Sequence, residues 1–335
     1  MKQFEIQEFG IDNLALVDRD APQPGAGEVL VKMTAASLNY RDDMVVKGVY
    51  NPKLKRPMIP LSDGVGVVQE VGTGVTEFKK GDRVASCFFQ GWQDGPPTKE
   101  KVEAALGGGV DGVLREYATF PQGGLVAVPN SLSDEEAATL PCAAVTAWHA
   151  LFENAPPAPG DSVVIQGTGG VAIFALQFAV AAGLRTIVTS SSDAKLARAK
   201  QMGASETINY KTTPDWEKIA RKLTNSEGVD HVIEVGGSET MPRSLRAVRT
   251  YGVVSVIGVL SGAEPTVSPR SILMNSVRVQ GIYVGSRAMF QRMNRALEFK
   301  RIKPVIDKTF DWTEIKEALR YMETQQHFGK ICLRF

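Results

Sequence analysis

The chain has 335 residues, which is enough for about two domains. Its 38 basic and 37 acidic residues leave a net charge of +1, which argues against binding to nucleic acid or a membrane surface and favours a small-molecule partner. The N-terminus lacks the apolar core of a signal peptide, and no run of ~20 consecutive apolar residues occurs that could span a bilayer. Cys87, Cys142 and Cys332 form no CxxC pair, so we expect a cytoplasmic protein with reduced thiols.

The first 125 residues alternate short β-rich runs with turns of Gly, Pro and Asp, which predicts a compact antiparallel domain. The expected strands cover residues 4–9, 14–20, 27–37, 64–72, 82–89 and 115–120.

From Asp134 onward, strand-like runs alternate with helical patterns such as 192–204 and 242–250. This alternation predicts an α/β fold with a doubly wound parallel sheet of six strands. The strands are expected at 162–166, 185–190, 206–210, 230–236, 252–259 and 278–285.

The last 50 residues, 286–335, are too short to form a domain alone. They contain helix patterns and two strand-like runs, 306–312 and 329–335, and we expect them to complete the first domain. The predicted domains are therefore 1–130 with 286–335, and 131–285.

A glycine-rich turn follows the expected strand at 162–166 and directly precedes an apolar helix. It fits the pattern GxGxxG/A, in which the glycines allow a tight turn, a close approach of backbone to a pyrophosphate, and helix packing. The same glycines can also serve packing alone, but the surrounding αβ alternation favours a dinucleotide site. The predicted cofactor-binding residues of the turn are Gly167, Thr168, Gly169, Gly170 and Val171.

The residues about 20 positions later bear on the choice between NADH and NADPH, because an NAD site places a carboxylate there. The chain has Ser190 and Ser191, with Lys195 in the next helix, and hydroxyls with an ammonium suit the 2′-phosphate of NADPH. Alternatively, Ser192 or Asp193 only caps the helix and Lys195 is solvated, or Asp193 binds the ribose. Tyr210 either flanks the adenosine phosphate or packs.

Six segments in order resemble the medium-chain dehydrogenase/reductase superfamily over nearly the whole chain. They are "PGAGEVLVKMTAASLNYRD", "IPLSDGVGVVQEVG", "KKGDRV", "LPCAAVTAWHAL", "GTGGVAIFALQFA" and "HFGK". The resemblance implies a GroES-like catalytic domain and a Rossmann domain with the nicotinamide in the cleft between them. It also implies a homodimer that pairs the sixth Rossmann strands, near residues 278–284.

The resemblance separates this chain from the superfamily's zinc enzymes, which use two cysteines and a histidine as catalytic ligands. At those positions the chain has Asn39, Ser62 followed by Asp63, and Cys142. An amide and a hydroxyl cannot replace a thiolate and an imidazole, and residues 88–117, in place of the structural zinc lobe, contain no cysteine. We therefore expect no metal and a place in the zinc-free branch.

Without a metal, the reaction is expected to form a delocalised anion that hydrogen-bond donors can stabilise. The resemblance places Asn39 and Tyr40 beside the nicotinamide as the candidate catalytic residues, and Asp42 among the cofactor-binding ones. Alternatively, Tyr40 packs, water is the proton donor, and Asn39 and Asp42 cap the helix that follows.

The resemblance also assigns Thr146 and Lys330 to the nicotinamide or phosphate region of the cofactor. Further cofactor contacts are expected at strand ends, although glycines there also make turns: Val235, Gly236, Gly258 and Val259. We expect three aromatic residues either to line a substrate pocket or to form the core beneath a loop; they are Phe88, Phe89 and Trp92.

The sequence thus predicts a zinc-independent, NADPH-dependent reductase of a quinone or an α,β-unsaturated carbonyl. One alternative is a zinc-free dehydrogenase of an alcohol, ketone or aldehyde, for which Tyr40 would supply a proton. Another is a protein that binds the cofactor with little turnover.

Overall fold

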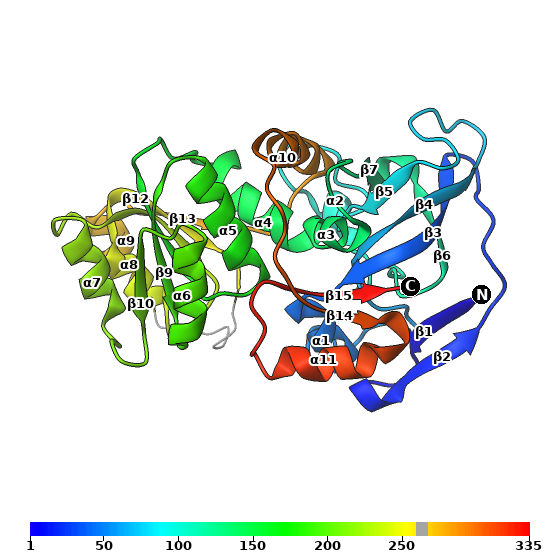
Figure 1. The fold of residues 1–335 in the computed structure, drawn as a ribbon, viewed down its shortest axis with the longest axis horizontal. Helices are drawn as coiled ribbons and strands as arrows, with labels where there is room; N and C mark the ends of the chain where they lie inside the picture. Colours follow the sequence, from blue (N-terminus) through cyan, green and yellow to red (C-terminus); the bar gives the residue numbers. More distant parts are fainter. Residues whose placement is uncertain (259–266) are drawn as a thin grey trace. The chain divides into compact units, whose positions relative to one another are not determined.

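The computed structural model describes residues 1–258 and 267–335 (Figure 1). The chain forms two compact units, which we call unit 1 (residues 1–145 and 284–335) and unit 2 (residues 146–283). Unit 1 extends to residue 145 because α3 (Asp134–Ala138) packs on β3 (Glu28–Ser37), β4 (Asp63–Val71) and β15 (Lys330–Arg334).

Unit 2 contains one parallel sheet of six strands, as the αβ alternation predicts. Its strands lie in the order β10-β9-β8-β11-β12-β13. The first three strands of this unit lead from β8 in the middle to β10 at one edge, and the next three lead from β11 in the middle to β13 at the other edge. The strands are β8 (Ser162–Gln166), β9 (Arg185–Ser190), β10 (Glu206–Asn209), β11 (Val229–Glu234), β12 (Val248–Val256) and β13 (Arg278–Gly281). The order in which strands are added to the sheet reverses between the parallel neighbours β8 and β11. Sheets of this kind bind ligands at such a point, outside the carboxyl ends of the two strands.

Helices cover both faces of this sheet, so its central strands are mostly buried and rich in apolar residues. Figure 1 shows α5 and α6 on one face and α7 and α8 on the other. All five residues of β8 are buried accordingly. The helices of this unit include α5 (Gly170–Ala181), α6 (Asp193–Gln201), α7 (Trp216–Leu223), α8 (Met241–Ala247) and α9 (Pro269–Met274).

The helix expected over 242–250 ends earlier, at Ala247. Val248 already pairs with Val229 as the first residue of β12, and Tyr251, at a φ of 60°, donates its N–H to the Asn275 carbonyl. Sheet pairing therefore takes over these residues from a helical pattern.

Unit 1 is built on a seven-stranded, mostly antiparallel sheet in the order β14-β15-β3-β4-β5-β7, with β6 paired to β3. Its other strands are β5 (Arg83–Ser86), β6 (Tyr117–Pro121), β7 (Leu125–Ala127) and β14 (Ile306–Asp311). The strands from the chain's end thus lie beside β3. A separate antiparallel pair joins β1 (Lys2–Ile6) to β2 (Leu14–Asp18), and β1 stops three residues before the expected strand end at residue 9.

Short helices complete unit 1, and α1 (Tyr40–Val46) follows β3 directly. Figure 1 shows α1 beside α11 (Ile315–Glu323), and Lys47 just after α1 forms an ion pair with Glu323 at the end of α11. The remaining helices are α2 (Lys99–Glu103), α4 (Val145–Trp148), which continues across the boundary into unit 2, and α10 (Arg287–Lys300).

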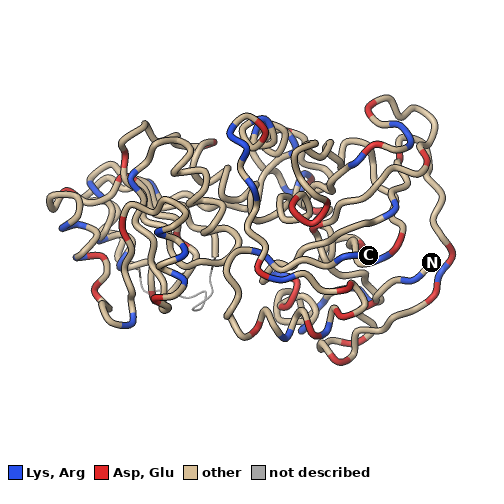
Figure 2. The backbone as a smooth tube through the Cα atoms, in the orientation of Figure 1, with Lys and Arg blue, Asp and Glu red and all other residues tan. Residues whose placement is uncertain are grey.

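Charged residues of both signs alternate along each unit in the described part of the chain (Figure 2). No described helix has the length and apolar character that a membrane crossing needs.

Candidate active site

The glycine turn of unit 2 leaves space beside its backbone. Gly167 adopts a φ of 78°, and Gly169 is the residue before the first turn of α5, at a φ of −78°. A Cβ added at either position would meet no heavy atom within 4 Å. Open space at the N-terminus of a 12-residue helix fits the diphosphate of a dinucleotide, because helix dipole and N–H groups favour an anion there. Thr168 is buried, and Gly170 and Val171 begin α5.

The predicted adenosine-phosphate residues gather at the ends of β9 and β10. Ser190 ends β9 opposite Asn209 of β10, and Tyr210 donates its N–H to the Ser190 carbonyl at 3.0 Å. Ser191 follows, and Lys195 lies in the first turn of α6. Sequence proximity and strand pairing therefore bring all four residues to one corner of the sheet.

The alternatives for this corner are partly realised. Ser192 caps α6, since its Oγ accepts from the Lys195 N–H at 3.4 Å. Asp193 accepts the Asn209 side-chain amide at 2.7 Å, so one of its oxygens already has a partner within the chain.

A buried polar network at the ends of β8 and β11 was not expected from the sequence. The fully buried Glu234 accepts from Gln166 Nε2 at 2.8 Å, from Thr240 Oγ1 at 2.6 Å and from the N–H groups of Gly236 and Gly237. Gln166 Oε1 in turn accepts from the N–H groups of Val235 and Gly236. The network therefore ties the loop after β11 to the residue before the glycine turn.

The two long polar side chains of this network were detectable one at a time, because Gln166 and Glu234 each end a mostly buried strand, but their contact was not. Gly258 follows β12 at the same sheet edge, where its N–H lies 3.4 Å from the Glu234 carbonyl oxygen. Val259 lies outside the described residues. Thr146 is the first residue of unit 2 and is buried.

Strand pairing in unit 1 brings together residues from three distant parts of the chain. Ser37 at the end of β3 pairs with Asp63 at the start of β4 and with Cys332 of β15, and the Leu38 N–H donates to the Ile331 carbonyl. Asn39, two residues after the end of β3, therefore lies beside Lys330, the first residue of β15.

We call the hydrogen-bonded set Asn39, Ser62, Asp63 and Lys330 the polar cluster. Lys330 is buried, and its ammonium donates to Asn39 Oδ1 at 2.6 Å and to the Leu38 carbonyl at 2.5 Å. Asn39 Nδ2 lies 3.4 Å from Ser62 Oγ, whose hydroxyl donates to Asp63 Oδ1 at 2.7 Å. The Cys142 N–H donates to the other Asp63 oxygen at 3.1 Å.

Burial dominates the electrostatics of the carboxyl groups here. It raises the pKa of Asp42 to about 7, against the opposing charge of Arg41. It also raises the pKa of Asp63, which the charge of Lys330 opposes. Asp42 Oδ2 accepts the Asn39 N–H at 2.8 Å, so Asp42 caps the start of α1, as the alternative interpretation expects.

The donor set at the positions of the zinc ligands does not fit zinc. Burial, reinforced by Asp63, raises the pKa of the Cys142 thiol far above its usual value, so it is not a thiolate at neutral pH. Asn39 and Ser62 are weak ligands, and the Lys330 ammonium already holds the Asn39 oxygen. Among the described residues no three His, Cys, Asp or Glu side chains form a metal-binding group.

Tyr40, the residue after Asn39, is 49% exposed at the start of α1. It borders an open depression with residues of α1 and of the end of α11, including Lys47 and Glu323. Its phenol is therefore accessible to solvent rather than packed inside unit 1.

The three aromatic residues proposed for a substrate pocket are interior residues in this structure. Phe88, Phe89 and Trp92 are at most 2% exposed, and their rings pack with centroids 4.7 Å and 5.8 Å apart. The Arg41 guanidinium covers the Phe88 ring at 4.6 Å and donates to the Leu106 carbonyl. This arrangement agrees with the alternative that these rings form the core beneath a loop.

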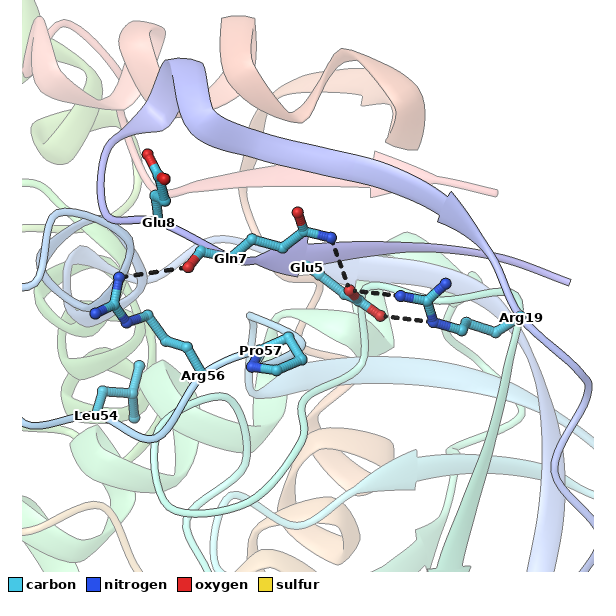
Figure 3. Close-up of a pocket in the computed structure, with 7 residues that line it drawn as sticks. All are labelled: Glu5, Gln7, Glu8, Arg19, Leu54, Arg56 and Pro57. Carbon is cyan, nitrogen blue, oxygen red and sulfur yellow. Dashed lines mark hydrogen bonds and ion pairs between the residues drawn. The ribbon is translucent and has the colours of Figure 1, made fainter.

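An open depression elsewhere on unit 1, beside β1, carries charged residues (Figure 3). Its charges are largely used within the chain: Arg19 forms an ion pair with Glu5 at 3.0 Å, and Arg56 donates to the Gln7 carbonyl at 3.3 Å. Nothing in it resembles a reaction centre, and the polar cluster remains the candidate in unit 1.

Comparisons with known proteins agree with this geometry. The chain matches the alcohol dehydrogenase GroES-like domain family over residues 25–130 and the zinc-binding dehydrogenase family over residues 170–299. It is 47% identical over 332 residues to a zinc-type alcohol dehydrogenase-like protein of Schizosaccharomyces pombe, covering 97% of this chain and 96% of that protein.

A solved structure of a Sinorhizobium meliloti protein described as an alcohol dehydrogenase matches with a TM-score of 0.93 at 42% identity, covering 100% of this chain and 98% of that one. A quinone oxidoreductase of Rattus norvegicus is 28% identical over 327 residues, covering 95% of this chain and 92% of that protein.

Proposed function

The chain belongs to the medium-chain dehydrogenase/reductase superfamily, and we propose that within it the protein is an NADPH-dependent reductase of quinones or α,β-unsaturated carbonyl compounds that works without zinc. The observation that carries this proposal is the polar cluster. It offers an amide donor and a fixed ammonium where a zinc enzyme would need thiolate and imidazole ligands.

The substrate class follows from the charge that the site can stabilise. Hydride addition to a saturated ketone leaves a localised alkoxide, for which a Lewis acid is most useful. Addition to a quinone or to the β-carbon of an enone leaves a phenolate or enolate with delocalised charge, for which hydrogen-bond donors can suffice. Asn39 Nδ2 is such a donor, and the similarity to the quinone oxidoreductase of Rattus norvegicus supports the same class.

The cofactor would be held mainly by unit 2, and when bound it supplies the hydride. The backbone of Gly167, Gly169 and Gly170 would bind its diphosphate at the N-terminus of α5. Ser190, Ser191, Lys195 and Tyr210 would bind the 2′-phosphate that distinguishes NADPH. Thr146, Val235, Gly236 and Gly258 remain the proposed contacts of the nicotinamide half, and Lys330 is proposed to lie near it while its ammonium holds Asn39.

Tyr40 is the proposed proton donor to the enolate, with water as the alternative source. Its exposure of 49% leaves both routes open, because solvent reaches the same position. Turnover of a Tyr40→Phe variant separates them: a strong loss identifies the phenol, and normal turnover identifies water.

The test is a substrate panel with NADPH, followed by cofactor absorbance and by deuterium transfer from C4-labelled cofactor. We expect an enone or quinone to be reduced much faster than a saturated ketone of similar size, with activity kept in chelator and no stoichiometric zinc by elemental analysis. Asn39→Ala is expected to lower turnover about a hundredfold with little change in NADPH affinity. Faster reduction of the ketone, or zinc that activity requires, would replace this proposal with the dehydrogenase alternative.

We also propose that two copies pair through β13. This strand is the last of its sheet, all four of its residues are exposed, and its outer edge pairs with no described strand. Exposed apolar residues adjoin it, including Leu273 at 76% and Met274 at 67% exposure. An open sheet edge with exposed apolar residues nearby favours pairing with a second copy.

A further inference from the structure

We infer that Lys330 is a positioning residue that fixes the orientation of the Asn39 side-chain amide, so that Nδ2 rather than Oδ1 is presented to the substrate oxygen. This inference rests on the proposed function, in which Asn39 stabilises the developing oxyanion. An amide can turn by 180° and exchange its donor and acceptor, so a catalytic amide requires a partner that decides between the two orientations.

The donors and acceptors of the polar cluster determine which of the two orientations the Asn39 amide adopts. An ammonium can only donate, so the Asn39 atom that lies 2.6 Å from Lys330 Nζ has to be the oxygen. The nitrogen then faces Ser62 Oγ at 3.4 Å and the Asp63 carboxylate, and both of these neighbours can accept its hydrogens. With the amide reversed, its NH2 group would face the ammonium and its oxygen would repel an oxyanion.

At the other end of this chain of hydrogen bonds, the Asp63 carboxylate accepts hydrogen bonds, whereas the Lys330 ammonium can only donate them. The Ser62 hydroxyl can donate or accept, but Asp63 accepts from Ser62 Oγ at 2.7 Å and from the Cys142 N–H at 3.1 Å. A Ser62 hydroxyl that donates to Asp63 presents its lone pairs to Asn39 Nδ2. The donor at one end and the acceptor at the other therefore select the same orientation of the amide.

The position of the ammonium is itself fixed. Lys330 is 3% exposed, and its Nζ also donates to the Leu38 carbonyl at 2.5 Å. Leu38 is tied to the strand of Lys330, since its N–H donates to the Ile331 carbonyl at 3.0 Å. The Lys330 side chain is therefore held in place by the same sheet that positions Asn39. An exposed lysine that binds a phosphate would instead have a mobile side chain.

The experiment is a double-mutant cycle on the full-length protein with Lys330→Met and Asn39→Ala. Lys330→Met is expected to lower kcat at saturating NADPH about a hundredfold, close to the effect of Asn39→Ala, and the double variant is expected to be no slower than Asn39→Ala. Lys330→Arg keeps a donor-only cation and is expected to recover part of kcat. Arg334→Met, on the same strand but in an exposed ion pair with Glu135, is the matched control and should keep full activity.

Two further readouts separate positioning from other roles. NADPH affinity, titrated by protein fluorescence, should change less than about threefold in Lys330→Met. The 15N side-chain amide signal of Asn39, assigned by its loss in Asn39→Ala, should shift in Lys330→Met and much less in Lys330→Arg. This signal requires no turnover, and thermal melting checks that each variant folds.

Three results would overturn the inference: an unchanged Asn39 amide signal in Lys330→Met, a normal kcat with weakened NADPH binding, or additive losses in the double variant. The second would make Lys330 a cofactor-phosphate ligand only. If the wild-type protein reduces ketones but neither quinones nor enones, the proposed function fails. The cycle is then measured with the ketone, where Asn39 has the same task, so the two failures remain distinguishable.

Discussion

Lys195 is the single residue that we propose to favour NADPH over NADH. It lies in the first turn of α6, beside the strand end that carries Ser190. We expect Lys195→Ala to weaken NADPH binding about fivefold, because an exposed ammonium beside a phosphate contributes about 1 kcal/mol, and to leave NADH binding unchanged. Fluorescence titration with both cofactors measures this, with Lys200→Ala on the same helix as control. Equal weakening of both would favour Asp193 as a ribose ligand.

His231 makes the stability of unit 2 depend on pH. Burial lowers its pKa from 6.5 to about 4, with a smaller effect from Arg278, and its Nε2 lies 2.8 Å from Ser255 Oγ. Because the unfolded chain binds this proton more tightly, stability is lost as pH falls from about 6.5 to about 4, by about 3 kcal/mol in total. The raised pKa of Asp42 acts in the opposite direction, so the measurement needs a variant that isolates His231.

We expect His231→Gln, which can keep a hydrogen bond to Ser255, to lose less stability than the wild type between pH 7.5 and 5.0. The difference should approach about 2 kcal/mol and can be measured from thermal melts at both pH values. Identical pH dependence in the two proteins would show that His231 does not control acid stability.

Two residues of the polar cluster, Asn39 and Lys330, were predicted as site residues, but the contacts within the cluster were not. The resemblance assigned Asn39 to the reaction and Lys330 to the cofactor, and the hydrogen bond between them depends on the pairing of β3 with β15, almost the whole chain apart. Likewise, Gln166 and Glu234 meet only because β8 and β11 are neighbours. Pairing between distant strands leaves no local signal in the sequence.

The glycine turn between β8 and α5 allows, at the scale of elements, a test that separates folding from binding. A Cβ at Gly169 enters open space at an ordinary φ of −78°, whereas Gly167 has a φ of 78° that strains other residues. Gly169→Ala should therefore melt like the wild type but bind NADPH about tenfold more weakly or worse, since the methyl group takes the space for the diphosphate. Gly167→Ala should also lose about 1 kcal/mol of stability. Normal NADPH binding by Gly169→Ala would place the diphosphate elsewhere.

Elements with strong local patterns were predicted well, and those decided by packing were not. The strands β8, β9 and β11 of unit 2 are largely buried and rich in β-branched residues. The end of α8 was misplaced because Val248 and Arg249 continue a helical pattern but pair in β12. The three-residue β7 is too short to produce a pattern of its own.

For the whole molecule, the alternation of strand and helix patterns predicted an α/β protein. The observed six-stranded parallel sheet confirms that fold class. The resemblance added the GroES-like unit, which the matching domain family supports. The residue at which unit 1 ends could not be predicted, because α3 belongs there through packing on β3 and β4 rather than through any composition change.

The proposed homodimer can be tested with one substitution on β13. Val279, 39% exposed at the sheet edge, is expected to lie between the two copies, so Val279→Lys would bring two like charges together at the pairing edge and bury them. Val180, 37% exposed on α5, packs toward Gly203 near the strand at the opposite edge, so Val180→Lys is a matched control. We expect light scattering after size exclusion to show a dimer for the wild type and Val180→Lys, and a monomer for Val279→Lys. A monomeric wild type, or a Val279→Lys dimer as stable as the wild type, would mean that the copies do not pair through this edge.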